Sequence, residues 1–159
     1  MVAGITGHRE LKNISWIKTM MQEIVNEVRI THGFTCLARG ADELFAEILL
    51  QNHVNYTAVI PCENYESTFD KTALVNFIFA KNKASKIIEL NNNEPSEKAF
   101  NDAGKFVVDS SEILIAVWNG EEAKGLGGTG DIVEYAKSKN KKIIHLNPIT
   151  KTKTNINHG

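Results

Sequence analysis

A glycine-rich run, GLGGTGD at residues 125–131, offers the clearest chemistry in this sequence. Gly127, Gly128 and Gly130 leave their backbone N–H groups accessible, and Thr129 adds a hydroxyl group. The run follows an apolar stretch and precedes a predicted helix, so these N–H groups should lie at a helix N-terminus, where the backbone dipole favours an anion. We therefore predict that the loop binds a phosphate, and a flexible connection without a ligand is the alternative.

The first predicted strand is followed by a second candidate loop, TGHR at residues 6–9. Gly7 allows a tight turn that other residues disfavour. Arg9 can bind a phosphate through two parallel hydrogen bonds, and His8 can donate or accept one. Thr6, Gly7, His8 and Arg9 are therefore candidate ligand-binding residues, although a plain turn with a solvated arginine would show the same residues.

The second predicted strand is followed by a loop of similar design, ARGAD at residues 38–42. Gly40 allows a helix start to approach a ligand closely, and Arg39 is a second candidate cation. Asp42 falls in the first helical turn, where a carboxylate also interacts favourably with the helix dipole. Because the two loops should lie side by side, we assign Arg39, Gly40 and Asp42 to the same ligand-binding site.

A weaker candidate is Tyr65, after the third predicted strand. Its ring could stack on a base, or it could be an exposed aromatic beside a helix cap. Cys36 and Cys62 are interpreted as buried thiols, and the five histidines lack zinc-ligand spacing with them. We predict no metal site and no cofactor.

Apolar segments of strand and helix type alternate along the chain, which indicates an α/β fold with a parallel sheet covered on both faces. Ligands of such sheets bind beyond the carboxyl ends of the strands, where all three loops would lie. The predicted strands are residues 2–6, 34–38, 56–60, 113–118 and 142–146, with a weaker run at 86–90. The predicted helices are residues 14–30, 41–51, 66–81, 96–110 and 130–139. Residues 1–148 are expected to form one domain, and the polar residues 149–159 a mobile tail.

Composition excludes some classes of protein. The chain has 159 residues, 42% hydrophobic and 23% charged, with a formal net charge of −1. This balance does not indicate a general nucleic-acid or membrane surface, so neither partner is expected. No apolar run approaches the roughly 20 residues of a membrane span. Two cysteines without a CxxC motif favour a reducing compartment, the cytoplasm.

Five segments together resemble the SLOG superfamily of Rossmann-like nucleotide-binding proteins, which includes LOG, DprA and YspA-like members. These segments are TGHR, ARGADELFAE, ENYESTF, DSSEILIAVWNG and GGTGDIVEYAKSKNKKIIHLNP, and the likeness extends over residues 2–148. The resemblance is to small stand-alone members. It implies a Rossmann-like three-layer α/β/α sandwich with a mainly parallel five-stranded sheet, in the order 3-2-1-4-5.

The resemblance leaves activity open, because SLOG proteins include LOG-type phosphoribohydrolases, DNA-binding DprA proteins and domains that bind ADP-ribose-related signals. The hydrolases carry a PGGxGTxxE loop with a catalytic Glu. One alignment places Glu134 on that Glu, and the other places Ile132 there. The hydrolases also use an arginine before the buried strand, where this chain has Lys105.

Two function classes therefore remain. The protein binds a nucleotide or nucleotide-derived signal, with Asp131 and Glu134 holding ribose hydroxyl groups. Alternatively it is a hydrolase or a deoxyribosyltransferase-like enzyme acting on an N-glycosidic bond, with Glu134 as the first catalytic candidate and Asp131 as the second. Since relatives often pair through helices, a homodimer or larger homo-oligomer is expected.

Overall fold

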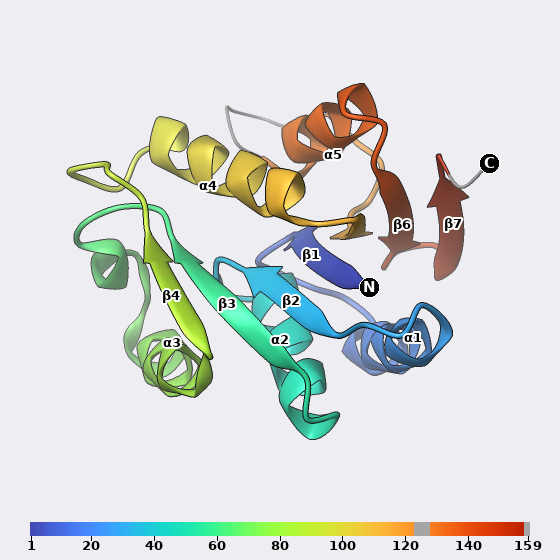
Figure 1. Ribbon diagram of the computed structural model, residues 1–159, viewed down its shortest axis with the longest axis horizontal. Coiled ribbons are helices and arrows are strands. Elements are labelled where there is room, and N and C mark those ends of the chain that lie inside the picture. Colours follow the sequence, from blue (N-terminus) through green and yellow to red (C-terminus); the bar gives the residue numbers. More distant parts are fainter. Residues whose placement is uncertain (123–127, 158–159) are drawn as a thin grey trace.

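The computed structural model describes residues 1–122 and 128–157 of the chain, and in them strands and helices alternate (Figure 1). The elements are β1 (Val2–Gly7), α1 (Ile14–Glu27), β2 (His32–Thr35), α2 (Ala41–Gln51), β3 (Asn55–Ile60), the short 3-10 helix η1 (Tyr65–Thr68), α3 (Lys71–Lys83), β4 (Lys86–Glu89), α4 (Glu97–Ser110), β5 (Ile113–Val117), α5 (Thr129–Ser138), β6 (Lys142–Asn147) and β7 (Thr152–Ile156).

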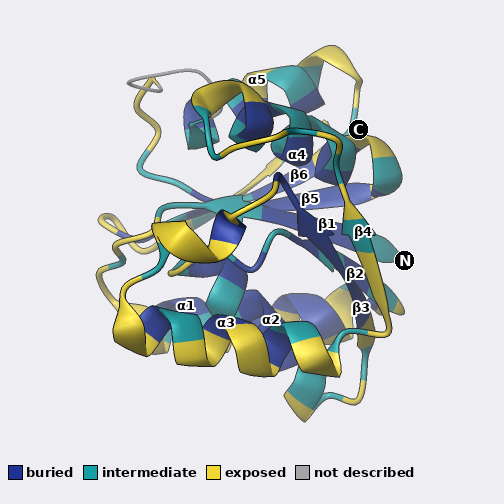
Figure 2. Ribbon diagram, turned by 90° about the vertical axis from the view of Figure 1, so that its left-hand side faces the viewer, coloured by how far each residue is buried: buried dark blue, intermediate teal, exposed yellow. Residues whose placement is uncertain are grey.

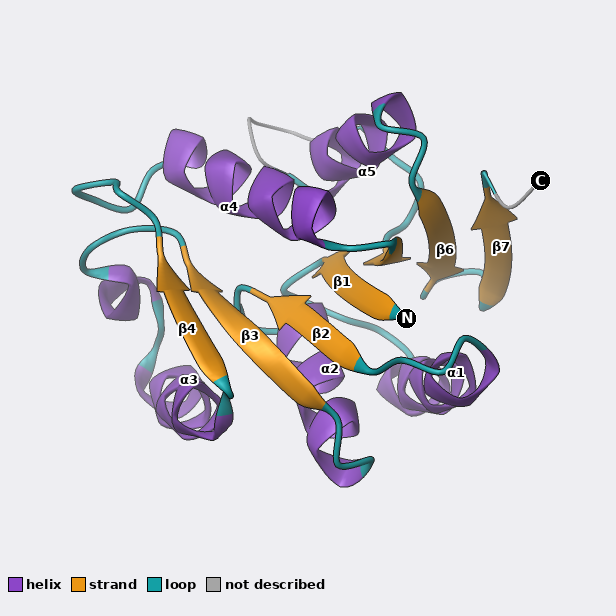
Figure 3. Cartoon of the chain, in the orientation of Figure 1, coloured by secondary structure: helices purple, strands orange, loops and turns teal. Residues whose placement is uncertain are grey.

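The strands of the described residues form one sheet in the order β4-β3-β2-β1-β5-β6-β7. Neighbouring strands are parallel except for β6 and β7. Helices α4 and α5 cover one face and α1, α2 and α3 cover the other (Figure 3). The predicted three-layer α/β class is confirmed, and the predicted order 3-2-1-4-5 corresponds to the run β3-β2-β1-β5-β6.

The sheet has two strands more than the five expected. The weaker apolar run forms β4, which pairs with β3 and ends one side of the sheet. Thr152–Ile156 forms β7, antiparallel to β6, where we expected a mobile tail. This segment is corrected to a strand because its threonines and Ile156 favour extended backbone, and its polar side chains suit an edge strand with one side in water.

One predicted helix, residues 66–81, is divided into η1 and α3. Phe69 is extended, and Asp70 begins α3 by accepting a hydrogen bond from the Ala73 N–H at 2.8 Å. Ser96 caps α4 in the same way, and its side chain accepts from the Ala99 N–H at 3.0 Å. These caps fix where the two helices begin.

The core lies on both faces of β5, whose five residues are all buried (Figure 2). On one face they pack with α1 and α2 side chains such as Ile24 and Phe45, and on the other with α4 and α5 side chains such as Val107 and Val133. Burial of an aliphatic side chain of this size contributes roughly 1.5 to 3 kcal/mol. The strands are therefore a rigid base for the turns at their carboxyl ends.

Candidate functional site

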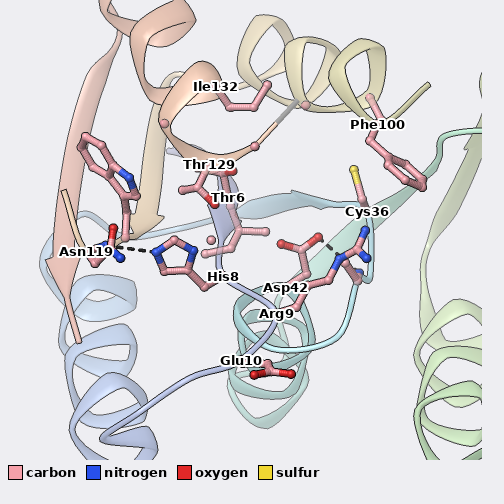
Figure 4. A pocket seen from close by; sticks show the side chains of 18 of the residues that line it. Thr6, His8, Arg9, Glu10, Cys36, Asp42, Phe100, Asn119, Thr129 and Ile132 are labelled. Atoms are coloured by element: carbon pink, nitrogen blue, oxygen red, sulfur yellow. Dashed lines mark hydrogen bonds between the residues drawn. The ribbon is translucent and has the colours of Figure 1, made fainter. Parts of the chain in front are cut away.

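A cavity of about 780 Å³ opens at the carboxyl ends of β1, β2, β3 and β5 (Figure 4). Its walls come from the turns after these strands, from the N-terminus of α5 and from α4. The volume is within the range of ligand pockets, roughly 300 to 1,000 Å³. Sequence reasoning placed a site at this edge of the sheet, and nine of its candidate ligand-binding residues line the cavity. They are Thr6, Gly7, His8, Arg9, Asp42, Tyr65, Gly128, Thr129 and Gly130.

The N-terminus of α5 forms one wall of the cavity through Gly128, Thr129 and Gly130. Gly128 is the N-cap residue and makes no side-chain cap hydrogen bond. The first N–H groups of a helix have no acceptor within the helix, so those of α5 are suited to an anion in the cavity. Gly127, predicted beside them, lies outside the described residues.

The turn after β1 is held against β5. The His8 N–H donates to the Val117 carbonyl at 3.1 Å, and the Asn119 N–H donates to His8 Nε2 at 3.2 Å. Because Nε2 accepts, the proton of a neutral His8 is on Nδ1. A Cβ at Gly7 would overlap with the Ala41 side chain, so glycine is required here by packing.

Arg9 extends along the cavity to α4. Its guanidinium carbon lies 5.4 Å from the centre of the Phe100 ring, a cation–π arrangement. Lys12 lines the same cavity. Two cations from the β1–α1 turn therefore border the space beside the N-terminus of α5.

Asp42 is the first-turn acid of α2, and it lines the cavity although the residue is only 7% exposed. The Ala38 N–H donates to its Oδ2 at 3.3 Å. Burial raises the pKa of Asp42 to about 7, while hydrogen bonds from the Ala38 and Cys36 backbone and the charge of Arg9 act in the opposite direction. Burial and the Asp42 charge raise the pKa of Cys36 well above its ordinary value, so Cys36 is a neutral thiol there.

Arg39 and Gly40 do not line this cavity. Arg39 forms ion pairs with Glu10 at 3.3 Å and Asp70 at 3.8 Å, and it borders a smaller cavity of about 170 Å³ that Arg9 also reaches. Gly40 has φ +90°, and a Cβ there would overlap with the carbonyl oxygens of His8 and Arg9. Gly40 therefore allows the β2–α2 turn to lie close against the β1–α1 turn. The Ala41 N–H also links the two turns, since it donates to the His8 carbonyl at 3.1 Å.

Tyr65 borders the cavity but is only 2% exposed. Its ring makes edge contacts with Phe69 and Phe77, and its hydroxyl donates to the Cys36 carbonyl at 3.0 Å. The residue is therefore buried in the core, and the alternative of an exposed aromatic does not hold. Its placement counts against base stacking.

The two acids proposed for ribose binding or catalysis do not line the cavity. Glu134 is exposed on the outside of α5 and forms an ion pair with Lys137 at 3.1 Å. Asp131 is the first-turn acid of α5 and half-buried. This placement counts against the roles predicted for both residues.

Phe100 and Asn119 are cavity residues that sequence reasoning missed. Asn119 could have been predicted as a cavity residue, because it follows the buried strand directly. Phe100 had none, since an aromatic residue in a helix usually indicates core. Gly104, one turn further along α4, also borders the cavity, and a Cβ there would overlap with the side chain of Ile132 on α5.

No group of three or more His, Cys, Asp or Glu side chains suited to a metal ion is found within residues 1–122 and 128–157. In the same part of the chain, no helix is both long and apolar enough to cross a membrane.

No protein-family model matches the sequence, and no curated protein matches it significantly. Solved structures match in fold. DNA processing protein A (DprA) from Helicobacter pylori gives a TM-score of 0.67 at 17% identity, over 92% of this chain and 65% of that one. DprA from Streptococcus pneumoniae gives 0.62 at 17% identity, over 90% and 49%. The protein TM1055 gives 0.57 at 12% identity, over 89% and 71%.

The chain shares its three-layer α/β fold with these solved structures. The resemblance seen in the sequence motifs is thereby confirmed at the level of the Rossmann-like fold alone. The chain spans about half of the S. pneumoniae protein and 65% of the H. pylori protein.

These neighbours contradict one expectation, that nucleic acid is not a partner. The H. pylori DprA structure describes a mode of single-stranded DNA binding in a protein of this fold. The expectation was wrong because it used the net charge of the whole chain. A total near zero does not exclude a local site in which helix N–H groups and two cations contact a phosphate.

Proposed function

We propose that the protein binds a nucleotide in the 780 Å³ cavity, with the phosphate at the N-terminus of α5 and the base toward Phe100. One observation carries the proposal: the uncapped N-terminus of α5 and the Arg9 guanidinium border the same cavity, at the carboxyl ends of the parallel strands. Anions bind at such helix starts, and ligands of open α/β sheets bind at this edge.

The charges around the cavity favour a ligand with one phosphate. Among residues 1–122 and 128–157, two cationic side chains line it, Arg9 and Lys12. Five carboxylate side chains also line it: Glu10, Asp42, Glu97, Glu121 and Glu122. A triphosphate would bring four negative charges beside these acids, whereas a monophosphate can be neutralised by two cations and the helix dipole.

The two arginines after β1 and β2 provide a matched pair for the test. Arg9→Ala removes a cavity cation, and loss of one charge-assisted contact weakens binding by about 1.5 to 3 kcal/mol, or at least about tenfold. Arg39→Ala removes the same charge outside the cavity, and we expect affinity within about twofold of the wild type. Calorimetry with nucleoside 5′-monophosphates measures both. Equal effects of the two substitutions, or no binding by the wild type, would contradict the proposal.

Binding of single-stranded DNA is a second candidate, supported by the fold shared with H. pylori DprA. In this case one nucleotide of a strand occupies the cavity. We expect a labelled oligonucleotide to bind with a salt slope of about −1.4, because two cations contact phosphate. Competition by a mononucleotide, followed by fluorescence anisotropy, tests whether the two ligands share the site. A strand that binds without such competition would place DNA elsewhere on the protein.

N-glycosidic cleavage is not part of the proposal, because Glu134 is ion-paired on the outer surface of α5 and Asp131 does not line the cavity.

Cys36 and Cys62 are both free thiols. They fit a reducing compartment, and we expect the protein to act in the cytoplasm.

A further inference from the structure

The cavity has two ends of different character, on either side of the N-terminus of α5. We define the inner end of the cavity by Cys36, Ala38, Asp42 and Phe100, which lie near Arg9. We name the outer end by Trp118, Asn119, Glu121, Glu122 and Ile149. The outer end is open to water, since Glu121 and Glu122 are exposed and Ile149 is 56% exposed. In Figure 4, Asp42, Arg9 and Phe100 lie on one side of Thr129, and His8 and Asn119 on the other.

The inner end suits a planar ring rather than a phosphate. The Phe100 ring borders this end and offers a stacking surface, which every base can use. The Asp42 carboxylate would repel a phosphate at the same place. Binding pockets of this kind combine apolar walls with a few polar groups that fix the orientation of the ligand.

Asp42 supplies that polar group. An ionised carboxylate has two acceptor oxygens and no donor, so it selects ligands that present N–H groups. Guanine presents two adjacent donors, N1–H and N2–H. Adenine and cytosine each present one amino group beside a ring acceptor. Thymine presents its single N–H between two carbonyl oxygens, which a carboxylate repels.

On the basis of the proposed nucleotide binding, we infer that Asp42 reads the base and that the inner end of the cavity is a guanine site. The competing role for Asp42 is structural, because its Oδ2 accepts from the Ala38 N–H and holds the turn between β2 and α2. A third role is binding of ribose hydroxyl groups. The base-reading role alone predicts that the substitution changes the ranking of the bases.

The test compares the four deoxynucleoside 5′-monophosphates by calorimetry at pH 8.5. We expect the wild type to bind deoxyguanosine monophosphate at least about tenfold more tightly than thymidine monophosphate. Asp42→Asn keeps an oxygen that can accept from the Ala38 N–H, but replaces the second acceptor by a donor. We therefore expect the guanine-to-thymine ratio to fall about tenfold in the variant.

Glu97→Gln is the matched control, since it removes a carboxylate from the same cavity at its exposed rim. It should raise the affinity for all four nucleotides alike and leave their ranking unchanged. Equal affinities of the wild type for the four bases would overturn the inference while leaving nucleotide binding intact. An Asp42→Asn ratio equal to that of the wild type would also overturn it, since a turn-holding or ribose-binding role affects all four nucleotides equally. Absence of any nucleotide binding would instead overturn the proposed function.

Discussion

The turns after β1 and β2 contain the same residue types and bring opposite charges to the cavity. The β1–α1 turn runs for six residues before α1 begins at Ile14, so Arg9 is free to extend over Phe100. The β2–α2 turn is only one residue shorter, from Cys36 to Gly40, which is the N-cap of α2. Asp42 lies in the first turn of α2 and borders the cavity, whereas Arg39, just before the helix, does not. The place of a side chain relative to the helix start, rather than the length of the turn, therefore determines which one reaches the cavity.

The largest expected effect concerns the charge that the β2–α2 turn contributes. Asp42 has a pKa of about 7 in the folded chain against an ordinary value of 3.8. Between these two pH values the native state keeps a proton that the unfolded chain has released, so wild-type stability falls as pH rises through this window. The loss reaches about 4 kcal/mol above pH 7. Asp42→Asn does not titrate, and its stability advantage over the wild type should grow by that amount between pH 3.5 and pH 8.5.

Urea unfolding of both proteins across this range measures the difference. Parallel pH profiles would mean that Asp42 has an ordinary pKa in the folded state. The two turns would then no longer differ through a buried acid with a raised pKa.

The next largest effect concerns the contact between the two turns. Gly40 and Gly120 both have positive φ, +90° and +88°, but only Gly40 lies against other backbone atoms. Alanine at Gly120 should cost about 1 to 2 kcal/mol for its backbone conformation alone. Alanine at Gly40 should cost about 2 kcal/mol more, because its Cβ displaces the β1–α1 turn. Chemical denaturation compares the two variants, and equal losses would show that the turns do not depend on this contact.

The smallest effect concerns a hydrogen bond to Cys36, the first residue of the β2–α2 turn. The Tyr65 hydroxyl donates to the Cys36 carbonyl, and Tyr65→Phe should cost about 1 kcal/mol in unfolding free energy. Tyr135→Phe is the control, since that hydroxyl binds Asp109 at the surface and contributes less. Nucleotide affinity should stay unchanged in Tyr65→Phe. A tenfold weaker affinity would restore Tyr65 as a ligand-binding residue.

Much of the fold follows from local patterns. The residues 113–117 are uninterruptedly apolar, as a strand buried on both faces requires, and α2 coincides with the predicted residues 41–51. β7 could not be predicted in the same way. Its threonines and Ile156 favour extended backbone, but the segment is mostly polar, and pairing with β6 completes the strand. That pairing belongs to the tertiary structure, and no local pattern encodes it.

The candidate site was predictable in place but only partly in composition. Strand ends indicate where loops gather, and this placed Arg9, Thr129 and Gly130 correctly at the cavity. The direction of a side chain near a helix start depends on the tertiary contacts around it, which sequence patterns do not resolve. Arg39 and Glu134 were assigned to the site, but Arg39 pairs with Glu10 and Asp70, Glu134 pairs with Lys137, and neither lines the cavity.

Gly104 has a consequence for the length of the ligand that the cavity of this fold can hold. It lets Ile132 pack closely, and so sets how near α5 lies to α4. The start of α5 and Phe100 on α4 border opposite parts of the same cavity, so one missing side chain fixes the span between them. A lineage that replaced Gly104 by alanine or serine would move the two helices apart and lengthen that span, with every ligand-contacting residue unchanged. Adaptation to longer ligands would then begin at a helix-packing position, where Gly104 lies against Ile132.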